Sequence, residues 1–250
     1  MTSREKPIRL DLALVARGLA ASRSQARDLV RRGAVSIGGA TATRPGIGIS
    51  DDDALAVADG AGGWVSRAAL KLLAALDHFA FDAAGRVALD VGASTGGFTQ
   101  VLLQRGARRV YAVDVGHGQL HPSVADEPRV VDLSNRDART LASEHVSELV
   151  GAIVADVSFI SLTKVLPAAL ALAAPGCWLV ALVKPQFEAG RAAVGKGGVV
   201  RDPADRERAL TNVRDWLAEQ SGWRVVGALP SPIAGGSGNQ EFLLGAVRDA

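Results

Sequence analysis

The sequence predicts an α/β protein, in which a doubly wound, Rossmann-like sheet of seven strands follows a small N-terminal α+β domain. Three observations support this prediction. Apolar runs alternate with helical segments from about residue 66 onward, a glycine-rich turn follows the first of these runs, and the first fifty residues differ in charge from the rest. Alternation of this kind is typical of a mainly parallel sheet with helices on both faces.

Seven segments of the larger domain have the composition of strands. The first five are continuous runs rich in valine, isoleucine, leucine and alanine, as expected for parallel strands buried on both faces. We expect the last strand to be antiparallel and the ligand to bind at the carboxyl ends of the parallel strands. The predicted strands are 86–91, 109–115, 129–133, 152–157, 177–183, 224–229 and 241–247, and the predicted helices are 66–80, 97–105, 161–173 and 203–220.

The N-terminal fifth of the chain is strongly basic. Residues 1–50 contain nine lysines and arginines and three acids, whereas the net charge of the whole chain is only +2. Two short helices and a strand are predicted within residues 8–37, and another strand at 53–58. We expect domains at 1–60 and 66–250, joined by a linker at 61–65. The local charge predicts a polyanionic partner, although a solvated basic surface is the plain alternative.

Other features of the composition narrow the setting. Cys177 is the single cysteine, so no internal disulfide can form, and its apolar surroundings predict a buried thiol. No apolar stretch approaches the roughly 20 residues that a membrane span needs, and no signal-peptide pattern opens the chain. We therefore expect a cytoplasmic protein without membrane association, bound metal or an obligate protein partner.

The strongest local signal is the segment 90–98, where a buried strand ends in an acid and a glycine-rich turn leads into a helix. A dinucleotide-binding fingerprint needs three glycines, but Ser94 occupies the middle position. The carboxylate of Asp90 would repel a pyrophosphate, whereas it suits the cationic methionine end of S-adenosylmethionine. The turn therefore favours S-adenosylmethionine over NAD. The candidate cofactor-binding residues are Asp90, Gly92, Ser94, Thr95, Gly96, Gly97, Phe98, Asp114, Asp137 and Asp156.

Two of these acids lie beyond the turn. Asp114 ends the second strand, where its carboxylate suits a ribose diol, so it does not distinguish the two cofactors. Asp137 follows the third strand and could accept a hydrogen bond from the adenine amino group. An ordinary solvated loop acid is an equally good interpretation of Asp137.

The ends of the later strands indicate the methyl acceptor. Residues 156–159 (DVSF) lack the Pro-Pro step that is usual in enzymes methylating exocyclic amines, and Cys177 lies away from the cofactor edge, which argues against cytosine C5 chemistry. What remains is a set of lysines and carboxylates that can meet at this edge. The candidate catalytic residues are Lys71, Asp156, Lys184 and Glu241. An ordinary salt-bridge cluster is the alternative.

The N-terminal segment resembles the S4 RNA-binding domain over residues 8–58. The resemblance rests on residues 9–11 (RLD), 18–19 (GL), 22–26 (SRSQA), Gly33 and the 35–39 strand and turn. It implies that basic side chains contact RNA phosphates, which position an RNA without reading its sequence. Arg23, Arg27 and Arg31 recur every four residues and predict one exposed basic stripe. The candidate RNA-binding residues are Arg4, Arg9, Arg23, Arg27 and Arg31.

The four candidate catalytic residues resemble the Lys-Asp-Lys-Glu tetrad of the FtsJ-like ribose 2′-O-methyltransferases. Nearly the whole chain is similar to the TlyA family of ribosomal RNA 2′-O-methyltransferases, long labelled haemolysins, through residues 90–98, 156–162, 183–188 and 237–241. The resemblance implies S-adenosylmethionine as cofactor and ribosomal RNA or a ribosomal subunit as partner.

The chemistry of a ribose hydroxyl suggests a role for each member of the tetrad. This hydroxyl is too weakly acidic to ionise at neutral pH, and a free lysine keeps its proton up to a pKa of about 10.4. Burial and a second cation would make a lysine a better base. Lys184 would act as base or alkoxide stabiliser and Lys71 as the neighbouring cation. Asp156 would orient Lys184, and Glu241 would position Lys71 or the ribose.

Three other functions remain open at this stage. A non-catalytic RNA-binding or assembly factor would keep the same surface, a membrane-lytic protein would fit the old family label, and an NAD-dependent enzyme is disfavoured by Ser94 and Asp90. The basic loop 190–198 could close over RNA or be a plain surface loop. Trp64, in the expected linker, could couple the domains to the cofactor pocket or simply anchor packing.

Overall fold

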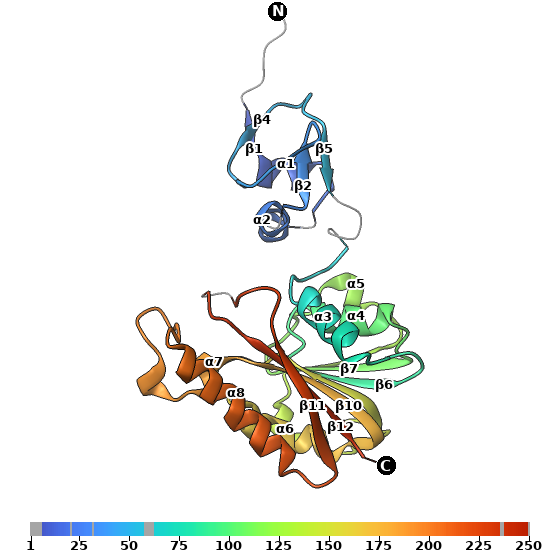
Figure 1. Ribbon diagram of the computed structural model, residues 1–250. Helices are drawn as coiled ribbons and strands as arrows, with labels where there is room; N and C mark the ends of the chain where they lie inside the picture. Colours follow the sequence, from blue (N-terminus) through green and yellow to red (C-terminus); the bar gives the residue numbers. More distant parts are fainter. Residues whose placement is uncertain (1–6, 21, 32, 58–62, 236–237, 250) are drawn as a thin grey trace, which may run out of the picture. The chain divides into compact units, whose positions relative to one another are not determined.

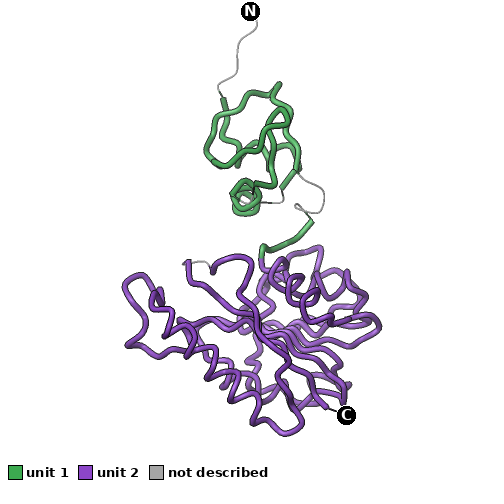
Figure 2. Tube along the Cα trace, viewed as in Figure 1, with its two compact units in different colours: residues 1–67 green, residues 68–250 purple. Residues whose placement is uncertain are grey.

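The computed structural model describes residues 7–20, 22–31, 33–57, 63–235 and 238–249. The contacts of the chain divide it into two compact units, Met1–Arg67 and Ala68–Ala250 (Figure 2). Each unit contains its own cluster of buried apolar side chains. Each is therefore a folded body with a core of its own.

The N-terminal unit packs two helices against short antiparallel strands. Strand β1 pairs with β4, and β2 lies between β3 and β5. The side chain of Ser22 accepts a hydrogen bond from the backbone of Gln25, which caps the second helix. The elements are β1 (Ile8–Arg9), α1 (Leu10–Ala16), α2 (Arg23–Arg31), β2 (Val35–Ile37), β3 (Ala40–Thr41), β4 (Gly48–Ile49) and β5 (Leu55–Val57).

The C-terminal unit contains a seven-stranded sheet in the order β11-β12-β10-β9-β6-β7-β8 (Figure 1). Strands β10, β9, β6, β7 and β8 are parallel, whereas β12 runs antiparallel to both of its neighbours. The predicted fold class is confirmed. The strands are β6 (Val87–Val91), β7 (Arg109–Asp114), β8 (Val130–Ser134), β9 (Val150–Ala155), β10 (Ala173–Val183), β11 (Trp223–Pro230) and β12 (Phe242–Arg248).

Helices cover both faces of this sheet. Figure 1 shows α3, α4 and α5 on one side and α6 and α8 on the other. None of the helices among the described residues is long and apolar enough to cross a membrane. The helices are α3 (Ala69–Phe79), α4 (Gly97–Gln104), α5 (Pro122–Ala125), α6 (Leu162–Ala171), α7 (Pro185–Glu188) and α8 (Pro203–Ala218), with 3-10 turns η1 (Ala138–Thr140) and η2 (Arg191–Ala193).

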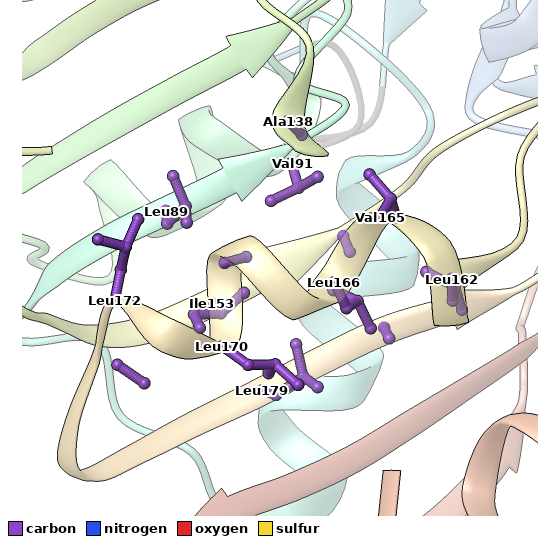
Figure 3. Packing of buried hydrophobic residues seen from close by; sticks show 14 of the residues in the cluster. Leu89, Val91, Ala138, Ile153, Leu162, Val165, Leu166, Leu170, Leu172 and Leu179 are labelled. Atoms are coloured by element: carbon purple, nitrogen blue, oxygen red, sulfur yellow. The ribbon is translucent and has the colours of Figure 1, made fainter. Parts of the chain in front are cut away.

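The main core lies between the sheet and α6. Leu89, Ile153 and Leu179, from three adjacent strands, are fully buried and belong to the same cluster as Leu162 and Leu166 of α6 (Figure 3). Burial of large aliphatic side chains stabilises each by about 1.5–3 kcal/mol. This packing fixes the parallel strands in register, so their carboxyl ends form a rigid platform for the loops that follow.

Two predicted boundaries of the larger unit differ from the structure by more than two residues. Strand β10 begins at Ala173 rather than at residue 177, because Ala173 pairs with Val150 before a register shift ahead of Trp178. Pro175 and Gly176 had the composition of a turn, but they form an irregularity within the strand. Helix α3 begins at Ala69, three residues later than predicted.

Candidate active site

Three of the candidate catalytic residues flank the ends of the neighbouring strands β9, β10 and β12, and the fourth, Lys71, lies on α3. Val183 of β10 faces Phe242 of β12, so Lys184 and Glu241 lie directly beyond this pair. The backbone of Asp156, which follows β9, donates a hydrogen bond of 2.9 Å to the carbonyl of Val91 at the end of β6. Strand β10 thus lies between β9, which leads to Asp156, and β12, which follows Glu241, while α3 with Lys71 packs on β12.

Lys184 and Asp156 form an ion pair, with 2.6 Å between Nζ and Oδ1. Lys184 also donates a hydrogen bond of 3.0 Å to the hydroxyl of Ser158. The two charged side chains are only 11% and 17% exposed, so they are shielded from bulk water while the carboxylate of Asp156 still reaches a cavity. Two partners fix the ammonium group of Lys184 at the end of β10.

Lys71 and Glu241 form a second, deeper ion pair. The Nζ atom of Lys71 lies 2.6 Å from Oε2 of Glu241, and the side chains are 7% and 3% exposed. A Cβ atom on Gly235 would come within 2.3 Å of Oε1 of Glu241, so the 235 backbone lies directly against this carboxylate. Glu241 is therefore the counter-ion of Lys71, which agrees with the first of the two roles expected for Glu241, to position Lys71 or the ribose.

A cavity of about 410 Å³ opens beside Asp156. Its lining includes five of the candidate cofactor residues, from the end of β7 and from the loops after β6, β8 and β9. These five are Gly92, Ser94, Asp114, Asp137 and Asp156. The cavity thus lies at the carboxyl ends of the parallel strands, where the fold places its ligands.

A hydrogen bond joins the turn after β6 to Asp114, the last residue of β7. Asp114 accepts a hydrogen bond of 2.9 Å from the backbone of Ser94 and one of 2.8 Å from the backbone of Gly116. Gly92 has a φ of +84°, and a Cβ atom there would lie 2.6 Å from the carbonyl oxygen of Asp156. Only glycine permits this conformation and this close approach.

Asp137 is held by its own loop. It accepts hydrogen bonds from the backbone and the guanidinium group of Arg139, the middle residue of the turn η1. The side-chain hydrogen bond from Arg139 lowers the pKa of Asp137. The carboxylate is therefore charged and partly occupied, although it still faces the cavity.

Asp90 is completely buried and does not line the cavity. One of its oxygens accepts a hydrogen bond of 2.6 Å from the hydroxyl of Thr99, and the other has no partner. Burial raises the pKa of Asp90 to about 7, with Thr99 opposing this effect and the nearby charges of Asp156 and Asp114 adding to it. Asp90 is thus a buried carboxyl group next to the turn, and its Oδ1 atom accepts no hydrogen bond from the described residues.

The remaining residues of the predicted cofactor loop shape the turn and do not line the cavity. The carbonyl of Thr95 accepts a hydrogen bond from the backbone of His121. Gly96 has a φ of +91° and packs so closely on Val124 that a Cβ atom would come within 2.9 Å. Gly97 and Phe98 are buried in the first turn of α4.

Three residues near this edge were not among the candidates. The first is Ser158, which binds Lys184. The second is Asn239, which is buried, accepts a hydrogen bond from the backbone of Val200 and donates one to the carbonyl of Gly198. Asn239 thus connects the end of the 190–198 loop to the segment before Glu241. Phe159 lines the cavity with 91% of its surface exposed and a φ of +65°. All three residues lie within the segments 156–162 and 237–241 that carry the family resemblance, and this position could have pointed to them.

Three arginines of the N-terminal unit gather around one acid. Arg9, Arg23 and Arg27 approach Asp11, so two members of the expected stripe turn toward this carboxylate. Arg31 is exposed at the end of α2, and Arg4 lies outside the described residues.

Two further residues noted in the sequence have structural contacts. The carbonyl of Trp64 accepts a hydrogen bond from the side chain of Gln25, so Trp64 belongs to the N-terminal unit. Cys177 is buried as predicted, and burial raises the pKa of its thiol to about 12. A thiol that keeps its proton is a poor nucleophile, which agrees with the exclusion of cysteine chemistry.

Comparison with known proteins assigns the class of each unit. Residues 64–248 match the FtsJ-like methyltransferase family and residues 8–55 match the S4 domain. The chain is therefore an FtsJ-like methyltransferase with an S4 domain in front.

Similarity to full-length relatives narrows the family. The chain is 51% identical to the 16S/23S rRNA (cytidine-2'-O)-methyltransferase TlyA of Mycobacterium tuberculosis, over 94% of this chain and 88% of the relative. It is 40% identical to Hemolysin A of Brachyspira hyodysenteriae, over 94% and 98% of the two chains. The solved structure of a protein named as a hemolysin from Streptococcus thermophilus superposes with a TM-score of 0.73 at 38% identity. The match covers 98% of this chain and 89% of that chain. The chain belongs to the TlyA family.

Proposed function

We propose that this protein transfers a methyl group from S-adenosylmethionine to a ribose 2′-hydroxyl of ribosomal RNA. The observation that carries the proposal is the 2.6 Å ion pair of Lys184 and Asp156 at the rim of a cavity built from the strand ends. The activity of the Mycobacterium tuberculosis relative, named for cytidine 2′-O-methylation of 16S and 23S rRNA, supports the same reaction class.

The residues around the cavity fit S-adenosylmethionine. Asp114 is fixed by two backbone N–H groups and offers its carboxylate to a ribose diol, while Asp137 offers an acceptor for the adenine amino group. Val157 and Ile160 add apolar surface for the adenine ring. The carboxyl groups of Asp90, Asp114 and Asp156 lie around the turn, which suits a cofactor that carries an ammonium and a sulfonium charge.

The tetrad residues then prepare the acceptor hydroxyl. When bound, S-adenosylmethionine supplies an electrophilic methyl group. Lys184, held by Asp156 and Ser158, takes the proton of the 2′-hydroxyl when its amine is neutral, or as an ammonium group stabilises the oxygen as it becomes anionic. Glu241 holds the ammonium group of Lys71 in an ion pair of 2.6 Å, so the position of this second positive charge is fixed. Positioning of this kind supplies much of the rate gain in an in-line transfer.

Two features support RNA as the acceptor. The S4 unit carries a cluster of arginines that suits phosphate groups. The exposed ring of Phe159, beside the cavity and 5.3 Å from the ring of Phe187, offers a surface on which an unstacked base could lie.

The decisive experiment measures tritium transfer from labelled S-adenosylmethionine to 16S and 23S ribosomal RNA, together with mass-spectrometric mapping of 2′-O-methyl groups. We expect transfer by the wild-type protein and a loss of at least a hundredfold in Lys184→Ala. Lys164→Ala removes an exposed lysine of α6 and should retain activity. Absence of both methyl transfer and cofactor binding in the wild-type protein would contradict the proposal and favour an RNA-binding assembly factor.

A further inference from the structure

Asp11 is an acid at the centre of the most basic part of the chain. Its side chain is completely buried, although it lies on the first turn of α1 and carries a charge. Burial of a carboxylate is costly unless several donors compensate it. The donors here are three guanidinium groups, from β1 and from two successive turns of α2.

The geometry around Asp11 is specific. Arg9 binds both carboxylate oxygens, at 2.9 and 3.0 Å, and Arg23 adds a hydrogen bond of 3.1 Å. Arg27 lies 3.8 Å from the same oxygen as Arg23. The hydrogen bond from Arg9 is the main reason why the pKa of Asp11 falls to about 2, so the carboxylate stays charged at any physiological pH.

The turn before β4 also makes room for this cluster. The backbone of Asp11 donates a hydrogen bond of 3.0 Å to the carbonyl of Pro45. A Cβ atom on Gly46 would come within 3.0 Å of the guanidinium group of Arg9, so a larger residue would push against it. The backbone therefore allows Arg9 to lie close over the turn.

The cluster retains an excess of positive charge toward solvent. Three cations meet one anion, and the side chains of Arg9, Arg23 and Arg27 are still 45%, 52% and 47% exposed. A guanidinium group has five donors, so each of these groups keeps free donors after binding Asp11. Three oriented guanidinium groups of this kind match the several acceptor oxygens of a phosphate.

We propose that Asp11 is a positioning residue for RNA binding, and that its buried carboxylate holds Arg9, Arg23 and Arg27 together as one preformed site for a backbone phosphate. The inference rests on the proposed function, because it takes RNA as the ligand. Without Asp11, the three cations would repel one another, and each would have to be ordered again when the RNA binds.

The sign of the effect of Asp11→Asn tests this inference. Charge alone predicts about two- to threefold tighter RNA binding, because the variant loses a negative charge close to the phosphate. Preorganisation predicts the opposite, about tenfold weaker binding. The measurement is filter binding of the full-length protein to 16S and 23S ribosomal RNA transcripts over a range of salt concentrations. Asp52→Asn, which removes an exposed acid of the same unit, is the matched charge control.

A second readout separates positioning from a general loss of structure. In methyl-transfer assays, Asp11→Asn should raise KM for RNA about tenfold and leave kcat and cofactor affinity unchanged. In a background of Arg9→Gln, Arg23→Gln and Arg27→Gln, the Asp11→Asn change should have almost no further effect, because it acts only through these arginines. An equal effect in both backgrounds would overturn the inference, as would tighter or unchanged binding by the single variant.

Arginine variants decide the case if Asp11→Asn does not fold. Arg27→Gln should weaken binding about tenfold and reduce the salt slope by about one, whereas Arg31→Gln, with the same charge change one turn further on α2, should cost clearly less. Equal losses would overturn the inference. If the wild-type protein binds RNA without methylating it, only the proposed function is contradicted. If it binds neither the 16S nor the 23S transcript, both proposals are contradicted.

Discussion

At the scale of single residues, the site depends on charges that are buried in pairs. Lys71 and Glu241 are 170 positions apart and almost inaccessible to water, yet their charged atoms are 2.6 Å apart. Removing one partner of such a pair leaves the other charge buried without compensation, which commonly costs about 3–5 kcal/mol. The pair is therefore important for folding as well as for chemistry.

This arrangement predicts a large difference between two carboxamide substitutions. Glu241→Gln should lower the melting temperature by roughly 6–12 °C, the shift expected for about 3 kcal/mol in a domain of this size. Asp77→Asn breaks the exposed pair with Arg105 and should have a much smaller effect, because exposed ion pairs contribute about 0–1 kcal/mol. Thermal melts followed by circular dichroism measure both. Equal shifts would show that the burial of the Lys71 pair does not matter.

Asp90 gives the apo protein a characteristic dependence on pH. Its folded pKa of about 7 lies above the ordinary aspartate value of about 3.9, so the folded state holds a proton that the unfolded state has already lost. The stability that this proton contributes is full below pH 4 and is lost as the pH rises toward 7.

The matching variant isolates this contribution. Relative to Asp90→Asn, the wild-type protein should lose up to about 4 kcal/mol of unfolding free energy between pH 4 and pH 7. Urea unfolding without cofactor, at several pH values, measures the difference. The exposed Asp126→Asn variant should follow the wild-type curve. A constant difference between Asp90→Asn and wild type would contradict a raised pKa.

At the scale of elements, the turn between β6 and α4 has little tolerance for side chains. Gly92→Ala should weaken binding of S-adenosylhomocysteine at least tenfold, because the added Cβ atom meets the carbonyl of Asp156. Gly85→Ala imposes a similar backbone strain, since Gly85 has a φ of +70°, but nothing lies within 4 Å of the added atom. Calorimetric titration compares the two variants. Equal affinities would show that the turn adapts.

Most of the elements were predictable from the sequence, because long apolar runs and helical spacing dominate their formation. All seven strands of the large sheet and its four longer helices lie where the patterns placed them, within a few residues. Short elements such as α5 and α7 were missed, since four residues have no periodicity to detect.

Partners distant in sequence were harder to predict. The tetrad could be proposed from the sequence, but the choice of Lys71 over the ribose as the partner of Glu241 depends on β12 lying beside β10, which no local pattern encodes. Asp11 was noted as one acid among basic residues and as part of the S4 motif, but its burial was not predicted, because it results from side chains of β1 and α2 meeting in three dimensions.

At the scale of the whole molecule, the two units have separate cores. Differential scanning calorimetry of the full chain should therefore resolve two unfolding transitions. S-adenosylhomocysteine at about a hundred times its Kd should stabilise only the larger unit, by about 2.7 kcal/mol. Asp11→Asn should shift only the other transition. A single transition that moves as a whole with the ligand would show that the units unfold together.

The position of β12 has a consequence for how the molecule is made. This strand is synthesised after β10 and β11, yet it lies between them. Until it emerges, β10 presents an open edge, which is a template for aggregation, and β11 has no partner in the sheet. A nascent chain therefore cannot assemble a partly working enzyme. A premature stop before residue 242 removes β12, so β10 and β11 cannot join one sheet. Completion of the sheet and placement of Glu241 next to Lys71 therefore depend on the same strand.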